Sequence, residues 1–496
     1  VRNPFVTLLP LFRDRPFTRF PRRGPPMATM KPPHPRPLAL VAAAALGATP
    51  PACAQSADAL IDKLVEKGIL TLDEANTLRE EADRDFTKAY AVKSGMPEWV
   101  STLRVSGDVR GRFDGIYGDH PGLADRARWR YRLRAGLTAV MYDNLEVGFR
   151  VGSGDADNAA SISRGVDPIS QNQSFQNNAA KKGLYLDTVY GRWSPINTGA
   201  WQGAFTVGKM ENPLVTSDLL YDPDYTPEGL GEQFAYTLNQ AHVLRLNAGQ
   251  FVVDELGGSG KDPYLFANQL RLESTHNPRW SSSLGAGFHV ISNEEQLTSS
   301  AVPDISTGNA RTVNVTRDAS GRATGFSLGA PVEEFETLVL DGSLTYTLDS
   351  APLFTGPFPI RLFGDYLHNL GANENNNGFQ AGIGFGRAGR KRTWELTYRY
   401  KYLEGDAWFE EMVDSDSGAY YQGPFSAASV PSTLRAPGTG YGSGTNIRGH
   451  WIRAAYSPYD SLLLGLTWYH LDLVEEYQPG TPSGIDRIQV DAVWRF

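Results

Sequence analysis

The feature that most constrains the fold is an alternation of apolar and cationic residues over residues 127–142. One set of alternate positions is apolar and includes Trp129, Tyr131 and Leu133. The intervening positions begin with Arg128, Arg130, Arg132 and Arg134. Because successive side chains of a strand point to opposite faces, such a strand has one apolar and one cationic face. The pattern is far longer than the mean strand of a soluble sheet, about five or six residues, and it predicts the wall of a transmembrane β-barrel.

Sixteen segments after residue 100 have a strand-like pattern. They are 103–114, 126–142, 144–152, 184–194, 203–211, 232–239, 241–252, 264–275, 280–292, 335–348, 358–369, 377–388, 391–404, 445–457, 460–473 and 484–496. Tight turns alternate with long loops rich in Gly, Asn and Ser, as an up-and-down barrel requires. The predicted fold class is therefore all-β, an antiparallel up-and-down barrel of about 16 strands over residues 97–496. Fourteen or 18 strands are the alternatives.

The N-terminal residues 1–54 have the features of an exported chain. After Met30, a basic start leads to an apolar run over residues 38–48 and then to a small-residue site at residues 52–54, which is the pattern of a secretory signal peptide. The apolar run is too short to span a bilayer as a helix. Cleavage after Ala54 would remove Cys53, the only cysteine. A mature chain without thiols suits export through an oxidising periplasm.

The charge balance excludes several classes of protein. Beyond residue 54 the chain has 39 basic and 54 acidic residues, a formal charge of −15, so nucleic acid is not an expected partner. No run of about 18 apolar residues occurs, so helical membrane spans are not expected either. Together with the signal peptide, these features predict a Gram-negative outer-membrane protein in contact with outer-membrane lipids.

Residues 55–96 differ from the rest because their pattern is helical and charged. An apolar stripe between residues 60 and 65 ends near Gly68, and residues 71–74 form a capping box that begins a second helix. One interpretation is a periplasmic oligomerisation element, such as a three-stranded coiled coil below a trimeric barrel. The other is a helical hairpin at the barrel mouth, and the repeat is too short to separate them.

The last strand ends in a recognisable assembly signal. Alternate residues on one face are Ile488, Val490, Ala492, Trp494 and Phe496. This arrangement resembles the C-terminal signature that the outer-membrane barrel-assembly machinery recognises. Trp494 and Phe496 are therefore the predicted assembly signal, and that machinery is the expected partner during biogenesis.

Two parts of the chain resemble a known family. Residues 208–213 read GKMENP, followed by SDLLYD at 217–222 and PEGL at 227–230. A leading helix over residues 64–78 contains KGILT at 67–71. These segments resemble the bacterial putative-porin family, outer-membrane barrels with an N-terminal periplasmic helical segment. The resemblance covers essentially the whole mature chain and implies a porin of sixteen or nearly sixteen strands that forms a homotrimer, but it says little about the solute.

The resemblance also indicates where the pore narrows. The first three outward connections are 115–125, 152–183 and 211–231, and in sixteen-stranded porins the third folds into the lumen. Here it is acidic, and its carboxylates are Glu211, Asp218, Asp222, Asp224 and Glu228. These five residues are the predicted constriction-loop acids.

Arginines on the first strands are the predicted partners of this loop. They are Arg104, Arg110, Arg112, Arg128, Arg130, Arg132, Arg134 and Arg150. Because arginine needs water or a counter-ion, a ladder of arginines inside a barrel lines a wet channel. Alternatively, some of them lie at the outer rims or pair with Asp108, Asp114 and Glu146 within the wall.

Other chemistry has weak support in the sequence. His289 lies on a polar strand face with Ser281 and Ser283, and it is the one histidine that could belong to the active site of a barrel hydrolase. Asp218, Asp222 and Asp224 lack the glycine-turned loop and closing glutamate of a calcium site. The Gly-x-Gly-x-Gly run at 440–444 has no following helix and does not predict a phosphate loop. We therefore expect no cofactor, no metal and no enzymatic activity.

The predicted function is a porin that passes small hydrophilic solutes and ions by passive diffusion through a water-filled pore with a constriction loop. An anion- or phosphate-selective channel is the alternative. A barrel enzyme and a structural or adhesive barrel are the remaining classes.

Removal of residues 56–94 tests the role of the helical segment. We expect the yield of trimers to fall, measured on native gels, while single-channel conductance in planar bilayers stays the same, because the segment lies outside the predicted pore-forming strands. An unchanged trimer content would favour the hairpin at the barrel mouth.

Overall fold

The structure is a computed structural model. The residues described are Val65, Glu74, Ala75, Thr77, Leu78, Pro97, 99–155, 169–298, 306–422, 429–434, 440–476 and 480–496. Contacts divide the chain into two units, Val1–Asp85 and Phe86–Phe496, and the second contains the barrel. In the segment 55–96, the five described residues are helical. The signal peptide and most of that helical segment lie outside the described residues.

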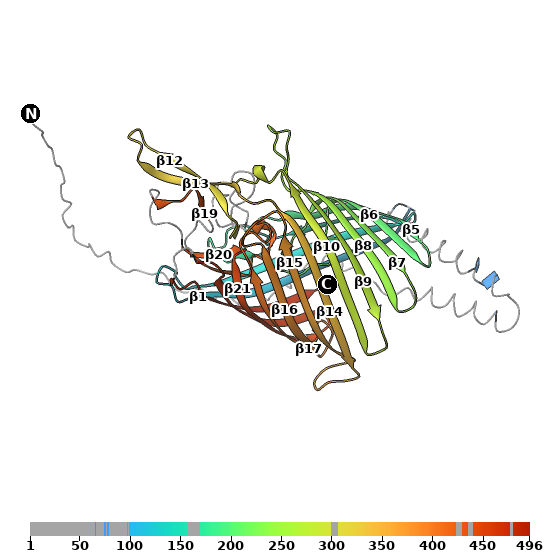
Figure 1. The fold of residues 1–496 in the computed structure, drawn as a ribbon. Helices are drawn as coiled ribbons and strands as arrows, with labels where there is room; N and C mark the ends of the chain where they lie inside the picture. Colours follow the sequence, from blue (N-terminus) through green and yellow to red (C-terminus); the bar gives the residue numbers. More distant parts are fainter. Residues whose placement is uncertain are drawn as a thin grey trace, which may run out of the picture. The chain divides into compact units, whose positions relative to one another are not determined.

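Sixteen antiparallel strands form the barrel (Figure 1). They are β1 (Val100–Gly118), β2 (Arg126–Met141), β3 (Leu145–Gly152), β5 (Tyr185–Asn197), β6 (Trp201–Lys209), β7 (Glu228–Thr237), β8 (His242–Val252), β9 (Tyr264–Thr275), β10 (Trp280–Ser292), β14 (Glu336–Leu348), β15 (Phe358–Asn369), β16 (Asn377–Gly386), β17 (Thr393–Leu403), β21 (Ile447–Tyr459), β22 (Leu462–Leu473) and β23 (Ile485–Arg495). Each strand pairs with the next barrel strand along the chain, and β1 pairs with β23. The predicted fold class is therefore confirmed.

The sixteen expected segments correspond one to one with these strands. Segments 264–275, 280–292 and 358–369 match β9, β10 and β15 residue for residue. The least regular segment, 232–239, corresponds to β7, which begins earlier, at Glu228. This earlier start is possible because Gly208 and Gly229 pair across β6 and β7 with positive φ angles, where a side chain would collide with a neighbouring backbone carbonyl.

The barrel has an apolar outer face and a polar inner face. Large apolar side chains that are exposed on the strands include Val109, Trp129, Phe149, Leu270, Leu284, Leu362, Leu466 and Val490. Alternating positions on the same strands are buried and polar, and they include Asp108, Arg112, Arg132, Gln269, Arg271, Gln380, Lys401 and Gln489. Exposed apolar side chains next to buried charges are what lipid outside and a polar lumen inside require. No helix among the described residues is long and apolar enough to span a membrane.

The first and last strands close the barrel. Their register runs from Asp108 opposite Arg495 to Gly118 opposite Ile485. Beyond this ladder, Gly107 and Phe496 exchange two backbone hydrogen bonds, of 3.0 and 3.1 Å. The last residue of the chain therefore extends the closing ladder, while its side chain lies exposed on the outside.

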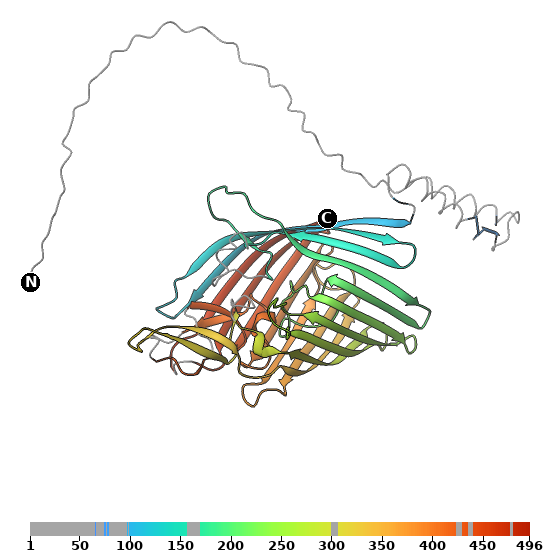
Figure 2. The same cartoon turned by 90° about the horizontal axis from the view of Figure 1, so that it is seen from above.

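The connections at one end of the barrel are long and partly folded. We name four of them: loop 2 (153–184), loop 3 (210–227), loop 5 (293–335) and loop 7 (404–446). Their short elements are β4 (Gln173–Ser174), η1 (Glu294–Gln296), β11 (Ser306–Thr307), β12 (Arg311–Arg317), β13 (Ala323–Pro331), η2 (Glu410–Met412), β18 (Gly418–Tyr421), β19 (Thr433–Leu434) and β20 (Gly440–Gly444). The hairpin β12–β13 projects beyond the ends of the barrel strands, whereas other parts of these loops lie over the barrel interior (Figures 1 and 2).

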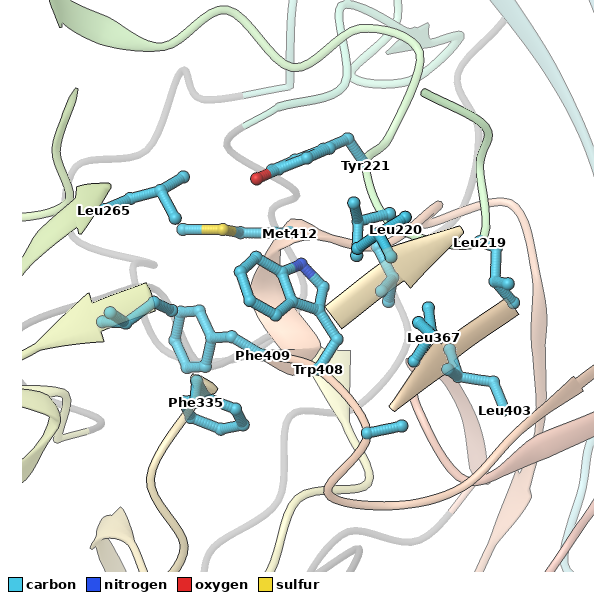
Figure 3. Packing of buried hydrophobic residues seen from close by; sticks show 14 of the residues in the cluster. Leu219, Leu220, Tyr221, Leu265, Phe335, Leu367, Leu403, Trp408, Phe409 and Met412 are labelled. Atoms are coloured by element: carbon cyan, nitrogen blue, oxygen red, sulfur yellow. The ribbon is translucent and has the colours of Figure 1, made fainter. Parts of the chain in front are cut away.

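Loops 3, 5 and 7 pack into an apolar core inside the outer half of the barrel (Figure 3). Leu219, Leu220 and Tyr221 come from loop 3, and Trp408 and Met412 come from loop 7. They pack against inward-facing apolar residues near the outer ends of the strands, which include Phe251, Leu265, Ile291, Leu367 and Leu403. Burial of this much apolar surface fixes the loops inside the barrel rather than above it.

Deletion of Phe496 tests the closing ladder. We expect folding into the membrane to be impaired while export continues, because the deletion removes two closing hydrogen bonds and the terminal aromatic residue. The fraction of heat-modifiable, folded barrel on gels measures the effect. Phe496→Leu keeps the backbone bonds and separates the two contributions. Wild-type amounts of folded barrel after deletion would contradict the prediction.

Candidate functional site

The arginine ladder faces the lumen from β1 and β2. The register places Arg110 opposite Arg132 and Arg112 opposite Arg130. Like charges directly opposite each other destabilise a sheet unless counter-ions separate them. The ladder therefore depends on nearby carboxylates.

Carboxylates on the same wall supply most of these counter-ions. Asp108 accepts hydrogen bonds from Arg132 at 2.9 Å and from Arg134 at 2.6 Å. Asp114 pairs with Arg128 at 2.7 Å. Pairing within the wall, the alternative weighed from the sequence, thus describes these three arginines.

The other carboxylates divide between the wall and the loops. Arg112 donates to Asp491 on β23 at 2.7 Å. Glu146, expected as an arginine partner, instead accepts a hydrogen bond from the Tyr190 hydroxyl at 2.8 Å. Glu146 lies on β3, next to β2, but its position along the strand explains the difference: it is opposite Val140, whereas Arg134 is opposite Gly152 at the other end of β3.

Arg104 and Arg150 lie apart from the others. Arg104 is exposed on the part of β1 that precedes the ladder with β23. Arg150 forms ion pairs with Asp187 on β5 and with Glu211 on loop 3. The structure therefore places Arg150 beside the acidic loop 3. Arg104 lies outside the group of arginines around that loop.

Two acidic residues of loop 3 contact basic residues on two separate parts of the lumen wall. Asp224 accepts hydrogen bonds from Arg132 at 3.3 Å and from Arg134 at 3.4 Å. Asp218 pairs with Arg399 and, at 3.1 Å, with Lys401, both on β17. Loop 3 thus crosses the lumen and is fixed by ion pairs at both sides.

The remaining two acids have other roles. Asp222 accepts backbone hydrogen bonds from Asp224 at 2.7 Å and from Ser415 of loop 7 at 3.0 Å. Glu228 is not a loop residue, because β7 begins at this position, and it pairs with Lys209 on β6 at 3.0 Å. The assignment of Glu228 to the constriction loop is therefore wrong.

The pKa values of two neighbouring buried carboxyl groups in the loops are shifted in opposite directions. Burial raises the pKa of Asp218, but the adjacent Arg399 and Lys401 outweigh it and hold that pKa below its usual value. Burial also raises the pKa of Asp414 in loop 7, to about 6, with Lys401 opposing and Asp218 adding to the shift. Asp218 is therefore ionised at neutral pH, whereas Asp414 gains a proton under mildly acidic conditions.

Loop 7 also reaches into the lumen, which the sequence reasoning missed. Asp416 forms ion pairs with Arg112 and Arg487, both at 2.9 Å. A further ion pair, between Arg311 and Glu410 at 2.6 Å, joins loops 5 and 7, and each side chain is 2% exposed. The sequence feature that could have predicted this position of loop 7 was the apolar run around Trp408 in a connection that is otherwise polar.

Several cavities remain around these loops. The main chamber has a volume of about 830 Å³ and is lined by Arg110, Arg112 and Arg132 of the ladder together with Asp218, Asp222 and Asp224 of loop 3. A smaller outer chamber, of about 330 Å³, is lined by Arg128 and Arg130. The ladder and the acidic loop therefore share one polar space inside the barrel.

The remaining candidates do not assemble a reactive site. His289 is 1% exposed, and its Nδ1 hydrogen-bonds the Tyr221 hydroxyl at 2.8 Å. Ser283 on the same strand hydrogen-bonds Arg271 instead. Among the described residues, no group of His, Cys, Asp or Glu is arranged to hold a metal. The run at 440–444 forms β20, which pairs with β18 and β11.

The closed barrel, its apolar outer face and its charged lumen define a transmembrane β-barrel of the porin type. The family model described as putative porin matches residues 120–320. This match, from β2 to β12, confirms the resemblance over that part of the chain, including all of loop 3. Over these residues the chain is similar to the putative-porin family, and the closed barrel with its apolar outer face is the fold of an outer-membrane protein.

Several solved outer-membrane proteins are similar in structure. OprB of Pseudomonas putida is 11% identical, with 84% of this chain and 97% of that chain covered and a TM-score of 0.46. A loop-deleted OmpT of Vibrio cholerae is 10% identical, with coverages of 80% and 99% and a TM-score of 0.41. DcaP of Acinetobacter baumannii is 11% identical, with coverages of 79% and 97% and a TM-score of 0.39. No curated protein matches the sequence significantly.

Glu410→Gln tests how loop 7 is held. The substitution removes the charge with which Glu410 pairs to the buried Arg311, and breaking a buried ion pair costs about 3–5 kcal/mol. We expect faster limited proteolysis within loop 7, while the barrel stays heat-modifiable. Glu295→Gln is the matched control, because its pair with Lys261 is exposed and contributes about 0–1 kcal/mol. Equal proteolysis in both variants would contradict this role for the ion pair.

Proposed function

We propose that this porin passes small hydrophilic solutes and ions by passive diffusion. The observation that supports this most directly is the main chamber, a cavity of about 830 Å³ inside the barrel whose lining is dominated by charged and polar side chains. A polar lumen replaces part of the hydration of a hydrophilic solute, which an apolar passage cannot do.

The constriction in this proposal is built by loop 3 together with loop 7. Asp222 and Ser415 join the two loops, while Asp224 and Asp416 attach them to arginines of the ladder. Both loops are also fixed by the apolar core at the outer end. The pore is therefore narrowed by a braced structure rather than by one loop.

The charges at the constriction favour weak ion selectivity. Asp218 and Asp224 on loop 3 lie against basic residues of facing walls, so positive and negative groups oppose each other across a short distance. Such an arrangement gives a transverse field that orients dipolar solutes. An anion-selective channel is the second candidate, favoured by Arg110, which has no carboxylate partner among the described residues.

The assembly proposals concern parts that the structure does not describe. A homotrimer is proposed because the resemblance implies it and because residues 55–96 have the pattern of an oligomerisation element. The signal peptide and the contact with the barrel-assembly machinery are proposed on the sequence alone. Non-enzymatic action is proposed because His289, the one catalytic candidate, is buried against Tyr221.

Reversal potentials under a salt gradient test the constriction. Arg130→Ala with Arg132→Ala should shift preference toward cations, because Asp108 and Asp224 then lose a counter-ion. Asp218→Asn with Asp222→Asn should shift it toward anions, because Arg399 and Lys401 lose theirs. We expect each pair to change the permeability ratio about twofold or more, since charge at a narrow site acts on every passing ion.

Arg279→Gln is the control, because this arginine lies in an exposed turn and pairs with Asp349. Its reversal potential should equal that of the wild type. If neither lumen pair moves the reversal potential, these residues do not form the constriction. If the purified protein gives no conductance and hydrolyses lipid or peptide, the porin proposal itself is wrong.

A further inference from the structure

Two chambers of the lumen adjoin each other at residues of loops 2 and 7, and we name this place the neck. Both chambers are lined by Ser170 and Asn172 of loop 2 and by Ser415 and Asp416 of loop 7. The main chamber extends to the short-turn ends of β15 and β16, whereas the outer chamber lies below the first long connection. A solute that crosses by way of these cavities therefore passes the neck.

Asn172 lies between two arginines at this neck. Arg110 donates from Nη2 to the Asn172 side-chain oxygen at 2.6 Å, and Arg130 donates from Nη2 to the Asn172 backbone oxygen at 3.4 Å. The amide nitrogen of Asn172 donates in turn to Ser170 at 2.9 Å. Arg110 lines the main chamber and Arg130 the outer one, so one guanidinium belongs to each side of the neck.

These two arginines differ from their neighbours in the ladder. Among the described residues, Arg110 has no carboxylate within ion-pair distance, and Arg130 reaches Asp114 and Asp155 only at 3.8 Å. The Nε atoms of both arginines are buried and have no hydrogen-bond acceptor. A buried donor without an acceptor is costly, so these groups gain when an acceptor reaches them.

The nearby carboxylates are already used by other groups. Asp114 pairs with Arg487 at 2.8 Å as well as with Arg128, and Asp155 accepts from Ser174 at 2.9 Å. Asp416, the acid at the neck itself, pairs with Arg112 and Arg487. Arg112 and Arg487 thus each have a carboxylate within 3 Å, whereas the two arginines that flank Asn172 do not.

We propose that the neck is a transient binding site for the oxyanionic group of a small solute, a carboxylate or a phosphate. Such a group carries several oxygens in a geometry that matches the guanidinium fork. Arg130 receives it from the outer chamber and Arg110 releases it into the main chamber, each by turning its unpartnered edge toward the solute. This assignment rests on the porin function and specifies the solute class.

Block of the chloride current by inorganic phosphate tests the site, with acetate as the carboxylate probe. For Arg110→Gln and Arg130→Gln, we expect the phosphate concentration that halves the current to rise about tenfold, because each variant loses a charge-assisted hydrogen bond. Asn172→Asp should weaken block similarly while keeping both arginines, because the new carboxylate occupies them. Arg361→Gln is the control, since Arg361 lines the main chamber away from the neck, and its block should stay within about twofold of the wild type.

Broadening of the phosphorus resonance of phosphate by the folded protein in detergent measures binding without conduction. Broadening that is lost in the three neck variants and kept in Arg361→Gln would support the site even if the wild type failed to conduct, which would refute only the porin proposal. Unchanged block and unchanged broadening in heat-modifiable Asn172→Asp and Arg130→Gln would overturn the site. A response to acetate alone or to phosphate alone would identify which oxyanion the neck accepts.

Discussion

Hydrogen bonding between β1 and β23 is the interaction on which the rest of the molecule depends. A sheet in lipid cannot leave an edge unpaired, because each unsatisfied backbone group there costs several kcal/mol. The closing ladder, extended by Gly107 and Phe496, divides alternate side chains into those that face lipid and those that face the lumen. The arginines of β2 are tolerable only because closure places them inside, where water and carboxylates are available.

The interior of the barrel is divided along its axis into two kinds of packing. Near the outer ends, inward positions such as Leu265 and Leu367 are apolar and hold the loop core. Further along β9, the strand that contains Leu265, the inward residues Gln269 and Arg271 are polar. Loops 3 and 7 span this boundary, so hydrophobic burial fixes them on one side and ion pairs fix them on the other. The buried Arg311–Glu410 pair lies between loops 5 and 7 and favours one arrangement of both.

The strands were predictable because alternation is a local property of the sequence, and it also identified the face on which each arginine lies. The pairing of those arginines was not predictable, since it depends on register across strands, such as Asp108 opposite Arg134. Loop 7 was missed for a similar reason, because its contact from Asp416 to Arg112 joins residues 304 positions apart. The apolar residues around Trp408 were the one local sign that this connection returns into the barrel.

Because most lumen arginines are paired with carboxylates, the net charge of the chain does not by itself determine which ions the lumen attracts. A guanidinium bound to a carboxylate contributes a local dipole rather than a net charge, and its best donors are already occupied. The formal charge of −15 beyond residue 54 is a sum over many groups, and the field of each exposed group is screened within about 8–10 Å at physiological salt. What a solute meets at the neck is therefore set by the donors that remain after pairing. In the described lumen these are foremost Arg110 and Arg130, so a chain with excess acid can still offer hydrogen-bond donors to an anion at the neck.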